Sequence, residues 1–99
     1  MLNIKTGGDG GVLTVALEGR LDTVTAPKLE KRFKEALPGV AELVMDCEKL
    51  DYISSAGLRV LLSAQKNMNR QGSMKLIQVS ESIMEILEVT GFSDILTIE

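Results

Sequence analysis

The chain is organised around Tyr52-Ile53-Ser54-Ser55-Ala56-Gly57-Leu58-Arg59-Val60-Leu61-Leu62, where a short apolar, strand-like run gives way to two serines and then to a helical pattern. From Gly57 onward apolar residues recur at helical spacing, with polar residues interleaved as far as Arg70. This pattern predicts an amphipathic helix of about four turns. Gly72 follows it, and we interpret this glycine as a left-handed cap that ends the helix.

The two adjacent serines stand at the mouth of this helix. Ser54 or Ser55 is placed to be the N-cap, because a serine hydroxyl there accepts a hydrogen bond from an unpaired amide of the first turn. The same position suits a covalently attached anion, since free N–H groups and the positive end of the helix dipole favour negative charge. Phosphorylation of a serine would place about two negative charges there. The pattern alone leaves both the plain cap and the modification site open.

Composition limits the class of protein. The chain has 99 residues, of which 44% are hydrophobic and 25% charged, so we expect one soluble domain spanning residues 1–99. Its net charge is −3 and its basic residues form no block, which argues against nucleic acid as a partner. No apolar run is long enough for a membrane span, and the amino terminus lacks the pattern of a secretory signal. We therefore expect no membrane partner and a cytoplasmic location.

The chain contains one cysteine and no histidine. An internal disulfide, the usual zinc sites and histidine-dependent nucleophilic catalysis are therefore excluded. Cys47 ends an apolar run, and we interpret it as a small buried thiol. We expect no cofactor, no metal site and no catalytic residue. The enzymatic alternative would use Asp22, Asp46 or Asp51 as acid or base.

The first third of the chain predicts two strands and a helix. Residues 1–6 and 12–18 have strand patterns, and the glycine-rich segment between them is a flexible hairpin connection. A turn from Gly19 leads into a helix with Thr25 as its cap and Pro27 in its first turn. Pro38-Gly39 ends that helix.

The apolar run at residues 43–47 predicts a strand buried on both faces, which implies a central parallel position. We expect a loop over residues 48–53, then the serines and their helix, then another strand at residues 74–79. Strand, helix and strand in this order form a βαβ unit. The serine pair therefore falls beyond the carboxyl end of a central strand, where open α/β sheets place their functional groups.

The last quarter of the chain predicts one more helix and a closing segment. Ser80 or Ser82 caps a helix that runs to Val89, and Gly91 ends it. Residues 92–98 form a last strand or an extended edge. The predicted fold class is α/β, with a mixed, mostly parallel sheet of four to five strands and helices packed on it.

Three separated blocks resemble a known family. They are Gly19-Arg20-Leu21-Asp22 before Ala26-Pro27, then residues 50–58, and finally Val89-Thr90-Gly91-Phe92-Ser93-Asp94-Ile95. The whole chain resembles a STAS domain, and specifically a stand-alone bacterial anti-sigma factor antagonist. The resemblance implies an acceptor serine followed by a small or hydroxyl residue and then Gly-Leu, which places phosphorylation on Ser55. With this match we favour the phosphorylation switch over the plain cap.

One residue departs from the family pattern. Members commonly carry Asp immediately before the acceptor, and here that residue is Ser54, which becomes a minor alternative acceptor. The resemblance also implies partner contact by Asp22 and Thr23, although closing the strand-to-helix turn is the structural alternative for both. The full set expected to contact a partner is Asp22, Thr23, Ser54, Ser55, Ala56, Gly57 and Leu58.

The resemblance implies a mechanism of partner switching. The unphosphorylated chain would bind an anti-sigma factor that is itself a serine kinase, and so release a sigma factor for transcription. Phosphorylation at Ser55 would oppose rebinding, and a serine phosphatase would reset the chain. We expect the chain to be monomeric when free. The alternative is a non-phosphorylated STAS accessory subunit of a transport or signalling complex, in which Ser55 only caps the helix.

Overall fold

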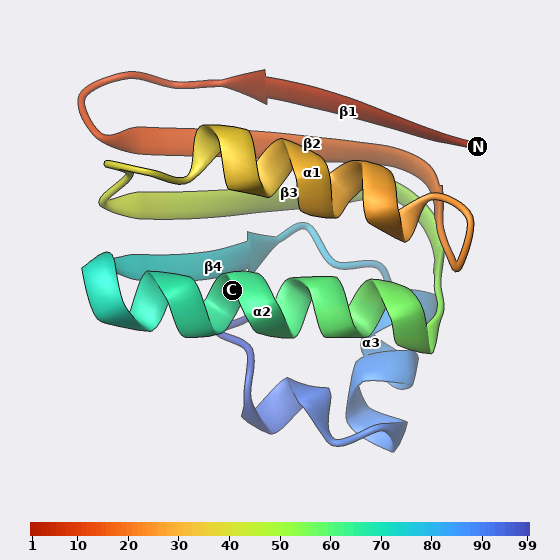
Figure 1. The fold of residues 1–99 in the computed structure, drawn as a ribbon. Helices are drawn as coiled ribbons and strands as arrows, with labels where there is room; N and C mark the ends of the chain where they lie inside the picture. Colours follow the sequence, from red (N-terminus) through yellow and green to blue (C-terminus); the bar gives the residue numbers. More distant parts are fainter.

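The computed structural model describes residues 1–99 as a four-stranded sheet with three helices and one short 3-10 helix (Figure 1). The elements are β1 Leu2–Gly7, β2 Val12–Leu21, α1 Ala26–Ala36, β3 Glu42–Ile53, α2 Ser55–Gln71, β4 Ser73–Ile77, α3 Glu81–Val89 and η1 Phe92–Asp94. The strands lie in the order β1-β2-β3-β4, with β1 antiparallel to β2 and the other pairs parallel. The predicted α/β fold class with a mixed, mostly parallel sheet is confirmed.

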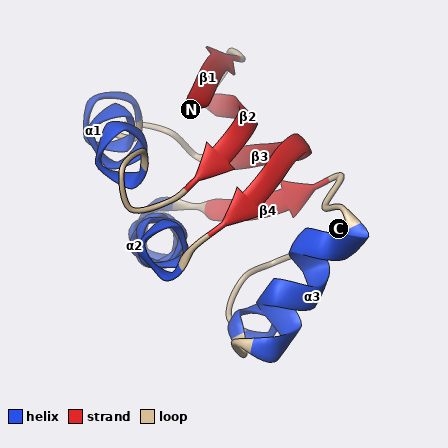
Figure 2. Ribbon diagram, turned by 90° about the vertical axis from the view of Figure 1, so that its right-hand side faces the viewer, coloured by secondary structure: helices blue, strands red, loops and turns tan.

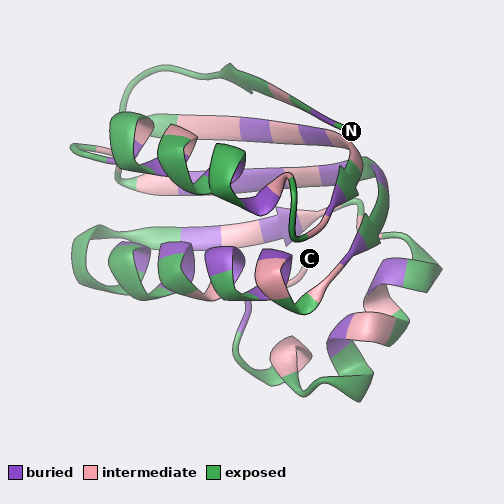
Figure 3. Cartoon of the chain, turned by 45° about the vertical axis from the view of Figure 1, so that its right-hand side comes forward, coloured by how far each residue is buried: buried purple, intermediate pink, exposed green.

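Helices cover the two faces of the sheet unequally. Helices α1 and α2 pack side by side on one face, and α3 lies on the other (Figure 2). The main core lies under α1 and α2, where the buried stripes of both helices face the sheet (Figure 3). In β3, Leu43, Val44 and Met45 are all buried, which confirms a central strand covered on both faces. No helix has both the length and the apolar character needed to cross a bilayer.

The loop predicted at residues 48–53 is wrong, because β3 continues as a strand to Ile53. It pairs with β2 along this whole length, although two register shifts interrupt the ladder. Such shifts disturb the alternation of buried and exposed residues. The buried residues here are Cys47, Leu50 and Ile53, every third residue instead of every second. The strand therefore leads directly into α2, with only Ser54 between them.

The carboxyl-terminal segment forms no strand. Residues 92–94 make η1, and a single bridge then joins Ile98 to Leu76 on the outer edge of β4. The strand predicted at residues 74–79 ends at Ile77, because Gln78 adopts a left-handed conformation at φ 55° and takes the chain out of the sheet.

One of the three predicted helix ends differs from expectation, and the structure decides between the two serines proposed for another. Gly72 is not left-handed, since its φ is 173°, and glycine is needed there because a Cβ would overlap the carbonyl oxygen of Ala41. Ser80, not Ser82, caps α3, and its Oγ accepts a hydrogen bond from the N–H of Ile83 at 3.3 Å. Gly91 follows the C-cap residue Thr90 and is left-handed at φ 81°, and α3 ends before it as predicted.

Candidate functional site

The site lies at the carboxyl edge of the sheet, where β2 and β3 end side by side. Leu21 and Ile53 are register partners, and the N–H of Ser54 donates to the carbonyl oxygen of Leu21 at 2.9 Å. From this point β2 enters the loop that leads to α1, and β3 enters α2. The pairing brings the Asp22-Thr23 segment and the serine segment together, although about thirty positions separate them in sequence.

Ser55 is the accessible serine. It is the first residue of α2 and its side chain is exposed. Ser54 precedes it in an extended conformation, and the carbonyl oxygen of Ser54 accepts the hydrogen bond from the N–H of Leu58 at 2.9 Å. Ser54 is therefore the N-cap by backbone geometry, and Ser55 presents its hydroxyl to solvent at the helix mouth.

The hydroxyl of Ser54 does not cap the helix. Its Oγ is buried and has no hydrogen-bond partner, so the predicted capping hydrogen bond is absent. A buried hydroxyl without a partner is unfavourable, because it loses its hydrogen bonds to water and forms none within the protein. The first turn of α2 consequently has no side-chain acceptor for its amides.

Gly57 and Leu58 seat α2 against the sheet. A Cβ on residue 57 would lie 2.6 Å from Cγ of Leu21 and 3.0 Å from Cγ1 of Ile53, so only glycine allows this approach. Leu58 is buried in the core. Within the set expected to contact a partner, Thr23 and Ser55 are exposed and Asp22, Ser54 and Ala56 are half-buried, while Gly57 and Leu58 lie beneath the surface.

Asp22 closes the turn between β2 and α1. Its Oδ1 accepts hydrogen bonds from the N–H groups of Val24 at 3.0 Å and Thr25 at 3.1 Å. Thr25 Oγ1 in turn accepts from the N–H of Asp22 and donates to the carbonyl oxygen of Arg20, both at 2.8 Å. The hydrogen bond from the Thr25 backbone is the main cause that lowers the pKa of Asp22. Thr25 occupies the N-cap position of α1 as predicted, but its hydroxyl bonds within the loop and not to the helix.

Two residues that the sequence reasoning missed lie next to this loop, at the ends of β2 and β3. Arg20 and Tyr52 are register partners, and the Arg20 guanidinium lies 4.4 Å from the centroid of the Tyr52 ring. Arg20 Nε also lies 3.7 Å from Asp22 Oδ2. The pair follows from cross-strand register, which shifts between Gly19 and Arg20, so no local sequence pattern reveals it.

A hollow of about 210 Å³ opens between the amino-terminal turns of α1 and α2, and Ala56, the residue after Ser55, is part of its lining. Small and apolar side chains line most of it, while Glu30 enters from α1 and Arg59 from α2. No ion pair joins these two residues within 4 Å.

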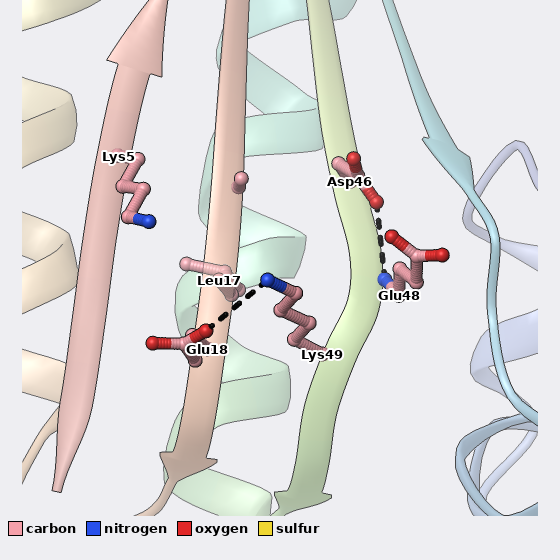
Figure 4. Close-up of a pocket in the computed structure, with 7 residues that line it drawn as sticks. Lys5, Leu17, Glu18, Asp46, Glu48 and Lys49 are labelled. Carbon is pink, nitrogen blue, oxygen red and sulfur yellow. Dashed lines mark hydrogen bonds and ion pairs between the residues drawn. The ribbon is translucent and has the colours of Figure 1, made fainter.

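A second hollow lies on the open face of β1, β2 and β3 and carries charges of both signs (Figure 4). Lys49 Nζ lies 3.6 Å from Glu18 Oε2, and Asn3 donates to Glu18 Oε1 at 3.1 Å. The hydrogen bond from Asn3, followed by the charge of Lys49, lowers the pKa of Glu18. Asp46 accepts a hydrogen bond from the N–H of Glu48 at 3.0 Å. Charges of both signs alternate here, as is usual on a sheet face in contact with water.

The aspartates of the enzymatic alternative are not brought together. Asp46 belongs to the hollow in Figure 4, whereas Asp22 closes the loop before α1 and Asp51 is exposed on β3. Cys47 is buried as predicted, and burial raises its pKa to about 12.

Comparison with known proteins identifies the family. Residues 3–99 match the family model of the STAS domain. The Bordetella bronchiseptica protein BtrV, named as a candidate anti-sigma factor antagonist, is 36% identical over 86% of this chain and 75% of its own length. The anti-sigma-B factor antagonist of Bacillus subtilis is 28% identical over 98% of this chain and 90% of its own length.

A solved structure has the same fold. The Bacillus protein SpoIIAA in its phosphorylated form superposes with a TM-score of 0.75 over 98% of this chain and 91% of its own, at 15% identity. The family assignment rests on the family model, which matches almost the whole chain, and on the sequence relatives. The chain therefore belongs to the STAS domain family, and within it to the anti-sigma factor antagonists, which are regulatory binding proteins and not enzymes.

Proposed function

We propose that this protein is an anti-sigma factor antagonist that phosphorylation of Ser55 switches off. In the unphosphorylated form it binds an anti-sigma factor that is also a serine kinase, and so releases a sigma factor. The observation that carries the proposal is the exposed hydroxyl of Ser55 at the start of α2, beside the loop that Asp22 closes. The names of the sequence relatives support an anti-sigma factor as the partner.

The docking surface in this proposal consists of Thr23, Ser55 and Ala56, with Asp22 and Ser54 at its edge. Gly57 and Leu58 contribute from below, because they set the position of α2 against the sheet. A phosphoryl group on Ser55 adds bulk and about two negative charges to this surface. Asp22 is already anionic at neutral pH, since hydrogen bonds lower its pKa. A partner that fits the unmodified surface would then meet excess negative charge, and a cost of about 3 kcal/mol would weaken binding about a hundredfold.

The chemistry of the switch needs only an acceptor oxygen from this chain. The γ-phosphoryl group of ATP, bound by the kinase, moves to Oγ of Ser55, the bond to the bridging oxygen of ADP breaks, and a base of the kinase takes the serine proton. A phosphatase resets the chain with water, which yields serine and inorganic phosphate. The buried hydroxyl of Ser54 supports Ser55 as the main acceptor, because a kinase cannot reach a buried oxygen in the folded chain.

The test incubates this protein with its cognate anti-sigma factor kinase and ATP and then maps the phosphorylated residue. We expect phosphate on Ser55 in the wild type and in Ser54→Ala, and none in Ser55→Ala. In binding assays Ser55→Ala should bind the kinase like the wild type and Ser55→Asp about a hundredfold more weakly. Equal affinity of all three forms, or an unlabelled wild type, would overturn the proposal.

A further inference from the structure

We infer that Arg59 is the counter-ion of phosphorylated Ser55 and holds the phosphoryl group against the first turn of α2. The inference rests on the proposed phosphorylation of Ser55 and adds a positioning residue to it. Both side chains are exposed, and they lie four residues apart on a helix of 17 residues.

Helix geometry brings Arg59 toward Ser55. Residues four apart are neighbours on a helix surface, with Cβ atoms about 5–6 Å apart. The Cα–Cβ bonds of a helix tilt toward its amino terminus, so the long side chain of Arg59 leans over the turn that carries Ser55. A guanidinium at this position can therefore reach a phosphoryl group on Ser55, and its planar fork matches two phosphate oxygens at once.

The other cations around the site already have partners. Arg20 pairs with Asp22 and stacks on Tyr52, and Lys28 Nζ donates to the carbonyl oxygen of Leu2 at 3.0 Å. The Arg59 guanidinium makes no side-chain hydrogen bond or ion pair in the chain, and it lines the hollow between α1 and α2 together with Ala56, the residue that follows Ser55. It is thus the cation left available at the helix mouth.

Two carboxylates could compete for Arg59. Glu30 faces the same hollow from α1, but no ion pair forms between them within 4 Å. Asp22 on the neighbouring loop is held by backbone amides and by Arg20. A phosphoryl group carries more charge than either carboxylate and lies on the same helix face as Arg59, so it is the stronger partner.

This pairing gives the switch a second effect. In the unmodified chain the Arg59 cation is free at the edge of the docking surface. In the phosphorylated chain Arg59 is paired with the phosphoryl group. The modification therefore adds an anion to the docking surface and also makes the Arg59 cation unavailable to a partner.

The test uses the full chain with phosphoserine encoded at position 55, so that no kinase is needed. The second pKa of the phosphoserine, ordinarily about 6, is followed by ³¹P NMR at low ionic strength. The variants are Arg59→Gln, Arg59→Lys and, as a matched loss of one exposed cation from α2, Lys66→Gln. Lys66 is eleven residues from Ser55, about 16 Å along the helix, and cannot reach the phosphate.

We expect Arg59→Gln to raise the phosphoserine pKa by about 0.3 unit, because removing the cation disfavours the dianion. Arg59→Lys should keep part of the effect and Lys66→Gln should leave the pKa unchanged. An unchanged pKa in Arg59→Gln, or an equal rise in Lys66→Gln, would overturn the inference. Such a result would not change the outcome of the kinase assay, which tests whether Ser55 is phosphorylated. An unlabelled Ser55 in that assay would likewise not change this titration, so failure of the inference and failure of the proposed function are distinguishable.

Discussion

Gly57 lies so close to Leu21 that a Cβ on residue 57 would approach Cγ of Leu21 to 2.6 Å. Leu21 is fully buried at the end of β2, and Ile53, the second neighbour, is buried at the end of β3. The first turn of α2 therefore rests on the ends of both strands, and the position of Ser55 depends on this contact.

Gly57→Ala should destabilise the protein by about 1–2 kcal/mol. Alanine gains about 1 kcal/mol of helix propensity, but the added methyl group overpacks the core by more than that. Urea denaturation measures the change, and Ser63→Ala on the exposed face of α2 is the control for propensity without a new contact. If Gly57→Ala were as stable as Ser63→Ala, the added methyl group would not be overpacking the contact with Leu21, and the prediction would be wrong.

Ser54→Ala should cost no stability, unlike most substitutions at an N-cap. The hydroxyl of Ser54 is buried without a partner, so alanine removes an unsatisfied group. Ser80→Ala is the matched control, because Ser80 Oγ does accept from the N–H of Ile83, and its loss should cost about 1 kcal/mol. Thermal unfolding of both variants provides the comparison, and equal losses would contradict the assignment of Ser54.

Asp22→Asn should change how stability depends on pH in the acid range. Hydrogen bonds, above all from the Thr25 backbone, lower the folded-state pKa of Asp22 below 3.8. The resulting stabilisation is present above pH 3.8 and is lost as the pH falls through the folded-state pKa. Urea unfolding at several pH values should therefore show a difference between wild type and Asp22→Asn that shrinks in acid. A difference that stays constant from pH 6 to pH 3 would exclude this contribution.

The Cys47 thiol should resist alkylation in the native protein. Burial raises its pKa from 9.0 to about 12, so almost no thiolate exists at pH 8. Iodoacetamide should label Cys47 only when urea unfolds the chain, as mass spectrometry would show. Because the pKa is raised, the stability that this thiol contributes below pH 9 should be lost as the pH rises toward 12. Native labelling as fast as that of a free cysteine would contradict this burial.

Local patterns predicted most of the fold. Three patterns each specify the structure of their own short segment: the helical spacing after Gly57, the proline near the start of α1 and the apolar run at residues 43–47. They are therefore visible in a single sequence, and they placed the serine pair at the carboxyl edge of the sheet. The second half of β3 was missed because its buried residues recur every third position, and that spacing follows from register shifts against β2.

The sequence by itself determined the order of the elements and the presence of two serines at a helix mouth, because periodicity and turn residues are local properties. Only the tertiary structure decided which hydroxyl faces solvent, which cations are already paired and how closely α2 approaches Leu21. Those features depend on strand register and on contacts between residues far apart in the chain, and no local pattern specifies them.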